Sequence, residues 1–288
     1  MKSDGRNQVC VAANLGFTEG PVVSPSGEIL VTSISDGGVY RVSSTGADAH
    51  FTSLGGGANG AVIDRSGTIF VAQNGGRWAS EGPSWMPASV GGVQKITLDG
   101  TVSWLTRDPI APNDLCFGPD GFLYVTDPTR SREISDGRIW RVDPQTGSAE
   151  ILLSTPWFPN GIAFDAENHL YLASTNDSRI YRADVVGRTL SQPELAIQMT
   201  SGYPDGMAFD ESGNLVIGAI SLTGDAGTIQ TWTSTGKPID EYSPGTGSFY
   251  TNVAFTPSGS LVITASDLGE VLVVHNWGAS GMPLHPFR

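Results

Sequence analysis

The sequence predicts an all-β protein, a six-bladed β-propeller with four antiparallel strands in each blade. First, the chain of 288 residues contains 37 glycines and 18 prolines, which is typical of many short strands joined by tight turns. Second, a turn followed by a hydrophobic-x-hydrophobic strand occurs six times, about 40 to 55 residues apart, which is the spacing of propeller blades. Third, a second strand signal such as "GRIWRV" follows each copy, so that each unit holds about four strands.

The six copies follow one another in register. They open at Gly27, Gly67, Gly121, Asn168, Gly213 and Gly259. Because one blade cannot bury both of its faces, six of them stacked in a ring form the core. The sixth unit has no clear outer strand, whereas the segment "NQVCVAANL" at the front is unassigned. We therefore expect the N-terminal strand to close the last blade, and we expect residues 1–288 to form a single domain, with blades starting near 19, 59, 113, 160, 205 and 251.

A polar residue recurs eight positions before each copy. The six are Glu19, Asn59, Asn113, Asn160, Asp205 and Thr251. The innermost strands of a propeller start at one end of the central channel, so these side chains are expected to converge around one axis. Asn and Asp also open turns, but Glu has no special role there. Carboxylates and carboxamides facing one point favour one divalent metal ion, with calcium first, then magnesium or manganese, and iron or zinc as further candidates.

Four motifs carry a family resemblance. "TEGPVV" at Thr18, "APNDLCF" at Ala111, "FPNGIAF" at Phe158 and "YPDGMAF" at Tyr203 resemble the metal-site motifs of the senescence-marker-protein/gluconolactonase/luciferin-regenerating family. Its members are six-bladed propellers with a divalent metal, and many hydrolyse lactones.

The resemblance also implies the roles of individual residues. Glu19, Asn160 and Asp205 would bind the metal, and Asn113 would be a further ligand or would bind substrate. Asp205 would also be the catalytic general base, a choice that the chemistry of the residues alone does not make over Glu19. Sugar-lactone members can carry an arginine just before the "ND" motif, where this chain has Ile110, Ala111 and Pro112. That departure indicates a substrate other than a polyhydroxylated sugar acid.

The resulting expectation is a metal-dependent hydrolase of lactones or related esters, in which the metal polarises the carbonyl group and a carboxylate takes the proton of the attacking water. Other reactions at the same metal (phosphotriester hydrolysis, isomerase or lyase chemistry) and a non-enzymatic binding platform are the alternatives. The expected substrate-binding residues are Asn59, Asn113, Asp127, Trp78, Trp85, Phe158 and Tyr203. For Asp127 the alternative is a turn cap, and for the aromatic residues it is packing.

Composition narrows the choice of partners. The formal net charge of −13 argues against nucleic acid and anionic membranes, since both attract a basic face. A small, fairly apolar lactone or ester is the expected partner. No apolar run is long enough for a signal peptide or a membrane span, so we expect a cytoplasmic protein.

Overall fold

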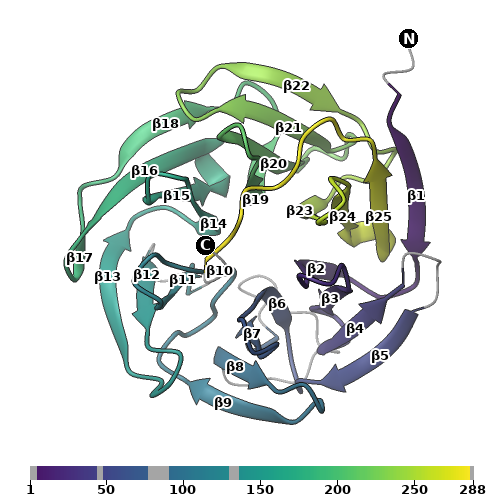
Figure 1. Cartoon of the computed structure of the whole chain (residues 1–288). Helices are drawn as coiled ribbons and strands as arrows, with labels where there is room; N and C mark the ends of the chain where they lie inside the picture. The colour runs from purple at the N-terminus through teal and green to yellow at the C-terminus, as the bar shows by residue number, and fades with distance from the viewer. Residues whose placement is uncertain (1–4, 44–47, 77–90, 130–135, 286–288) are drawn as a thin grey trace.

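Six small antiparallel sheets form a ring around a central channel, which confirms the six-bladed propeller (Figure 1). The computed structural model describes residues 5–43, 48–76, 91–129 and 136–285, and every count of sheets or strands refers to these ranges. Trp78 and Trp85 lie outside them. In each sheet the strands run from the channel to the rim, in sequence order except at the closing blade.

The strands fall into four concentric sets. The innermost strands are β2 (Thr18–Val23), β6 (Ala58–Ile63), β10 (Leu115–Phe117), β14 (Pro159–Phe164), β19 (Tyr203–Phe209) and β23 (Tyr250–Phe255). The second strands are β3 (Ile29–Ser33), β7 (Ile69–Gln73), β11 (Leu123–Asp127), β15 (His169–Ser174), β20 (Asn214–Ile220) and β24 (Leu261–Ala265). The third strands are β4 (Gly38–Val42), β8 (Gly92–Ile96), β12 (Gly137–Val142), β16 (Arg179–Val186), β21 (Thr228–Thr233) and β25 (Glu270–His275).

The outer strands are β5 (Asp48–Ser53), β9 (Val102–Thr106), β13 (Ala149–Thr155), β18 (Glu194–Gln198), β22 (Pro238–Tyr242) and β1 (Asn7–Ala12). The fourth blade adds a short strand, β17 (Thr189–Leu190), on the end of β16. Two single 3₁₀ turns, η1 (Thr175–Asp177) and η2 (Ser266–Leu268), follow the second strands of blades 4 and 6.

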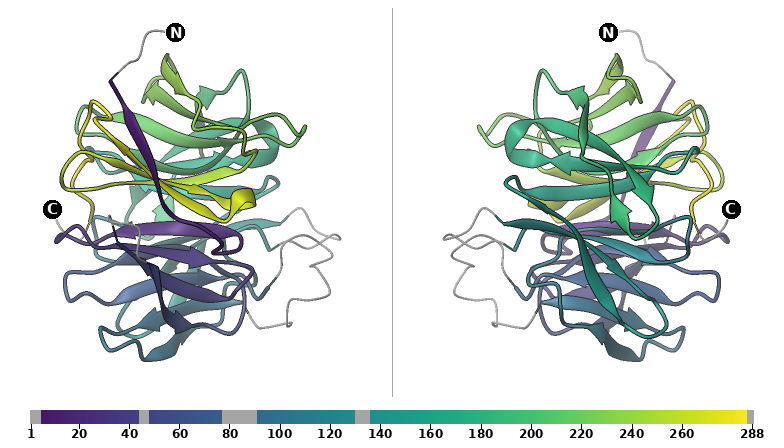
Figure 2. Two further views of the ribbon diagram at one scale, coloured as in Figure 1. Left: turned by 90° about the vertical axis from the view of Figure 1, so that its right-hand side faces the viewer. Right: turned by 90° about the vertical axis from the view of Figure 1, so that its left-hand side faces the viewer.

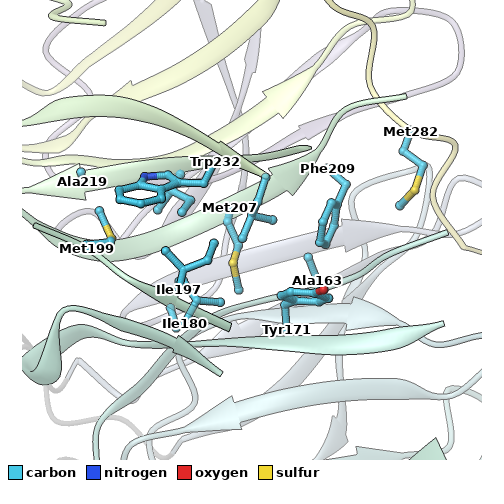
Figure 3. Packing of buried hydrophobic residues seen from close by; sticks show 13 residues of the cluster. Ala163, Tyr171, Ile180, Ile197, Met199, Met207, Phe209, Ala219, Trp232 and Met282 are labelled. Carbon is cyan, nitrogen blue, oxygen red and sulfur yellow. The ribbon is translucent and has the colours of Figure 1, made fainter. Parts of the chain in front are cut away.

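Apolar packing between neighbouring blades holds the ring together. The buried hydrophobic residues form six clusters, one at each junction between two blades. At the junction of blades 4 and 5, Tyr171 from β15 packs edge-on against Phe209 from β19, with ring centroids 5.0 Å apart, and Met207 and Trp232 lie in the same cluster (Figure 3). Each blade thus buries both faces against its neighbours, as the repeat requires.

The first and the last of the described strands pair in blade 6. β1 is the outer strand of this blade and pairs antiparallel with β25, from Asn7 opposite His275 to Ala12 opposite Val271. This confirms that the N-terminal strand closes the ring. Just before β1, the Arg6 guanidinium lies over the rings of Tyr242 and Trp277, 5.1 and 4.5 Å from their centroids.

The segment after β25 crosses one end of the central channel (Figures 1 and 2). Backbone hydrogen bonds tie it to blade 5, from Glu211 N to Ser280 O (2.8 Å) and from Met282 N to Phe209 O (3.0 Å). The innermost strands end at this face, so the recurring polar residues lie at the other end of the channel. Across the described ranges, we find no helix with the length and apolar character that crossing a membrane requires.

Candidate active site

The six recurring polar residues stand at the starts of the innermost strands, one from each blade, and none is more than 6 % exposed. The strand register shifts at this position in five blades, for example between Glu19 and Val22 and between Pro204 and Met207. A β-bulge removes a residue from the regular ladder and re-aims its side chain. These bulges therefore account for a polar side chain at the channel in a strand that is otherwise part of the core.

The position after each polar residue explains how closely the blades approach. Glycine stands there in four blades, at Gly20, Gly60, Gly161 and Gly206. A Cβ atom on Gly20 would lie 2.5 Å from the carbonyl oxygen of Asn59, and one on Gly161 would overlap the carbonyl oxygen of Asp205. The backbone of the next blade thus occupies the space of the missing side chain, which draws the site residues together.

The other two blades carry Asp114 and Asn252 at this position. The Asn252 side chain lies close enough to the Asp114 carboxyl to offset part of the rise in its pKa, although the two residues belong to blades 3 and 6 on opposite sides of the ring. The Asp114 carboxylate accepts from Leu115 N (2.8 Å). This pair spans the channel directly behind the site. This pair was not expected from the sequence. The sequence shows only that two of the six equivalent positions carry Asp and Asn where the other four carry glycine.

Hydroxyl groups fix the site residues from the neighbouring blade. Each hydroxyl comes from the second strand of one blade, or from the residue just after it, and donates to a carbonyl at the start of the next: Thr32 to Asn59 O (2.6 Å), Thr126 to Asn160 O (2.6 Å), Thr175 to Pro204 O (2.8 Å) and Ser266 to Thr18 O. These residues were not expected from the sequence.

The hydrogen bonds of the Thr175 hydroxyl determine the orientation of the Asn160 amide. The Thr175 hydroxyl has one proton, which it gives to Pro204 O, so it can only accept from Asn160. The atom 3.0 Å from Thr175 Oγ1 is therefore Asn160 Nδ2. Within the part of the chain that the structure describes, Asn160 Oδ1 is left buried with no hydrogen-bond partner. A buried acceptor without a partner is costly, and a metal ion would satisfy it.

The electrostatics of the site favour a cation. Burial, then the nearby Asp205 and then Asp114, raise the pKa of Glu19 well above its ordinary value. Burial raises the pKa of Asp114 to about 7. Glu19, Asp205 and Asn160 offer only oxygen atoms as donors, which are the ligands that suit a hard divalent cation such as calcium.

Asn113 and Asp127 belong to one local structure in blade 3. The Asp127 carboxylate accepts four N–H groups: from Ile110 N (2.8 Å) and Trp140 Nε1 (3.1 Å) on Oδ2, and from Ala111 N (3.0 Å) and Thr129 N (2.9 Å) on Oδ1. Both oxygens are thus engaged by N–H groups of the protein itself. Asp127 holds the segment that leads into Asn113.

Asn113 itself is anchored on both sides. Its N–H donates to Thr126 O and its carbonyl accepts from Gly60 N, each at 2.8 Å. The expected aromatic residues Phe158 and Tyr203 are half-buried and come two residues before Asn160 and Asp205. They lie at the same end of the channel as the site residues, in blades 4 and 5.

Two other features lie away from this site. A cavity of about 350 Å³ occupies the other half of the channel, from Asp114 and Asn252 to the C-terminal segment at Met282, with a mostly apolar lining. The acidic cluster of Asp165, Glu167 and His169 lies on the turn after β14, where Asp165 bonds the backbone N–H of both other residues (2.9 and 2.8 Å). Turn formation accounts for this cluster.

Comparisons with known proteins agree with the fold and with the extent of the repeats. Residues 17–267 match the family model described as SMP-30/Gluconolactonase/LRE-like region. A gluconolactonase of Zymomonas mobilis is 25 % identical over 295 residues, covering 89 % of this chain and 78 % of that protein.

Two solved structures show the same fold. A gluconolactonase from Xanthomonas campestris gives a TM-score of 0.77 at 18 % identity, covering 94 % of this chain and 90 % of the other. The calcium-binding protein regucalcin from Agrobacterium tumefaciens gives 0.75 at 18 % identity, covering 96 % and 95 %. At these identities the likeness concerns the fold.

Proposed function

Because the chain belongs to the SMP-30/gluconolactonase/LRE-like family, we propose that it is a divalent-cation-dependent hydrolase of lactones or related esters. The observation that carries the proposal is the group of buried oxygen atoms at the channel end: the carboxyl groups of Glu19 and Asp205, close enough for Asp205 to raise the pKa of Glu19, and Asn160 Oδ1, which has no partner among the described residues. The names of the gluconolactonase relatives support the same class of reaction.

Glu19, Asn160 and Asp205 would hold the cation, with Asn113 as a further ligand or as a hydrogen-bonding group for substrate. Calcium is the first candidate because all donors are oxygen, and the calcium-binding regucalcin structure supports it. When bound, such an ion supplies Lewis acidity at the ester carbonyl and a lower pKa of nearby water.

The protein's own part in the reaction is proton transfer and positioning. Asp205 takes a proton from a water molecule as the water oxygen attacks the carbonyl carbon. It then gives this proton to the ring oxygen of the lactone as the carbon–oxygen bond breaks, so that a hydroxy acid is released. The Thr175 hydroxyl fixes both the Asn160 amide and the carbonyl next to Asp205. Phe158 and Tyr203 would line the apolar side of the substrate.

Metal analysis and a substrate panel test the proposal. Native protein should contain about one divalent ion per chain, and removing it with a chelator should abolish hydrolysis of lactones or aryl esters until calcium is returned. The panel includes phosphotriesters, which would reveal the alternative reaction. Protein with no stoichiometric metal, or metal-loaded protein that hydrolyses no member of the panel, would overturn the proposal.

A further inference from the structure

Blade 2 carries two buried carboxamides with unpaired polar atoms. Asn59 is 1 % exposed, and neither its Oδ1 nor its Nδ2 has a hydrogen-bond partner among the described residues. Asn74 is 0 % exposed; its Oδ1 accepts from Gly76 N at 2.9 Å, and its Nδ2 has no partner. Because an N–H group can only be met by an acceptor, the bond to Gly76 sets the Asn74 amide with Nδ2 as its unpaired end. Unpaired buried polar atoms normally indicate a water or a ligand.

Equivalent hydrogen bonds place Asn74 beside Asn59. Asn74 N donates to Gly57 O, just as Thr175 N donates to Phe158 O and Ser266 N to Phe249 O. In each case the acceptor stands two residues before the recurring polar residue of the blade. The three donors therefore occupy one position of the repeat.

In blades 4 and 6 this position serves the recurring residue directly. The Thr175 hydroxyl bonds Asn160, and the Ser266 hydroxyl bonds Thr251. In blade 2 the pair is Asn74 and Asn59, and no such bond forms. A Cβ on Gly57 would overlap Asn74 Oδ1, so the Asn74 amide lies over the backbone that enters the innermost strand. Both Asn59 and Asn74 thus lie at the start of the innermost strand of blade 2.

We propose that Asn59 and Asn74 form a subsite for one hydroxyl group of the substrate, carried close to its ester carbonyl. A hydroxyl both accepts and donates: it would accept from Asn74 Nδ2 and donate to Asn59 Oδ1. A carboxylate could accept only from the two Nδ2 groups, would leave Asn59 Oδ1 unpaired and would add negative charge near Glu19 and Asp205. An apolar substituent would leave both amides unpaired.

The inference rests on the proposed lactone or ester hydrolysis and narrows its substrate. Asn59 is one of the ring of residues around the candidate cation site, so a group bound to it lies near the reacting carbonyl. The opposite side, in blades 4 and 5, carries the aromatic residues. The substrate class is therefore a lactone or ester with one hydroxyl group on an otherwise apolar frame.

Matched ligand pairs test the subsite on the calcium-loaded protein. Calorimetry compares α-hydroxy-γ-butyrolactam with γ-butyrolactam, which are not hydrolysed, and kinetics compares the two corresponding lactones. Wild-type protein should prefer the hydroxylated member of each pair by about 10- to 100-fold, the usual range for one buried hydrogen-bonded group. Asn74→Ala should remove most of this preference. Asn74→Asp should also lower it, because an acceptor then stands where a donor is needed, although the bond to Gly76 N is kept.

The control is Asn7→Asp, which adds the same charge on the exposed β1 and should keep the preference. Equal affinity of the wild-type protein for both lactams would show that the unpaired amide atoms of Asn59 and Asn74 bind ordered water only, and would refute the proposal. Full preference in Asn74→Asp with loss in Asn74→Ala would overturn it too, since Asn74 would then act only through Gly76. A lactam preference without any lactone hydrolysis would keep the subsite and refute the proposed reaction.

Discussion

The Thr175 hydroxyl joins two candidate ligands, and its removal tests the site most directly. It accepts from Asn160 Nδ2 at 3.0 Å and donates to Pro204 O, next to Asp205, at 2.8 Å. Thr175→Val keeps the shape of the side chain and removes the hydroxyl. Both partners then stay buried without a hydrogen bond, at a cost of about 1–3 kcal/mol each.

We expect the free energy of unfolding to fall by about 2–6 kcal/mol. By the usual relation for a chain of this size, the melting temperature should fall by about 4–12 °C. Because the Asn160 amide is then free to turn, calcium affinity should fall by about 10- to 100-fold, as is typical when a group that orients a metal ligand is lost.

Isothermal calorimetry with calcium and thermal unfolding measure the two effects. The matched control is Thr175→Ser, which keeps the hydroxyl and both hydrogen bonds. Calcium binding as tight in Thr175→Val as in Thr175→Ser would refute the reasoning, because Asn160 would then need no fixed orientation and would not be a ligand. Unchanged stability would show that the hydroxyl does not bridge these two groups.

Three further substitutions test other parts of the site. Asp205→Asn should lower the rate of lactone hydrolysis by about 10²- to 10⁴-fold without recovery at high calcium, whereas the activity of Glu19→Gln should recover as calcium is raised. Recovery of Asp205→Asn would contradict its role as base. The control is Asp225→Asn, at an exposed position. Asp127→Asn should lower the free energy of unfolding by about 2–4 kcal/mol in urea denaturation, because an NH₂ group then meets backbone or indole N–H donors; unaltered stability would argue against its role in holding the segment before Asn113. Gly161→Ala should cost about 1–3 kcal/mol of stability and weaken calcium binding, because its Cβ would overlap Asp205 O; a stable variant that binds calcium normally would contradict the close approach of the blades.

The repeat made the ring predictable, since each strand signal is local and recurs in register. The six recurring polar residues could be placed at one end of the channel for the same reason: equivalent positions in a ring converge. The choice of Glu19, Asn160 and Asp205 as metal ligands was implied by the family resemblance and stays a prediction. The number of blades and the closing role of the N-terminal strand are confirmed by the sheet order.

Other parts of the site depend on geometry that no local pattern carries. Asn74 follows the second strand of blade 2, and only its backbone bond to Gly57 shows that it belongs to the channel end. Asp114 and Asn252 are far apart in sequence and meet only across the closed ring. The residue type of Asp127 suits a place at the substrate, but the N–H groups that surround it come from three separate segments.

The pairing of β1 with β25 has a consequence for how the chain folds. Asn7 and His275 are far apart in the sequence, so among the described strand pairings this one closes the longest loop and carries the largest entropic cost. Such distant contacts slow folding. During synthesis, β1 emerges before the other described strands and must wait until β25 has formed. Until the two strands pair, each presents an open edge, the kind of surface through which incompletely folded chains associate. The late pairing of β1 therefore determines how long these two strand edges stay exposed during folding.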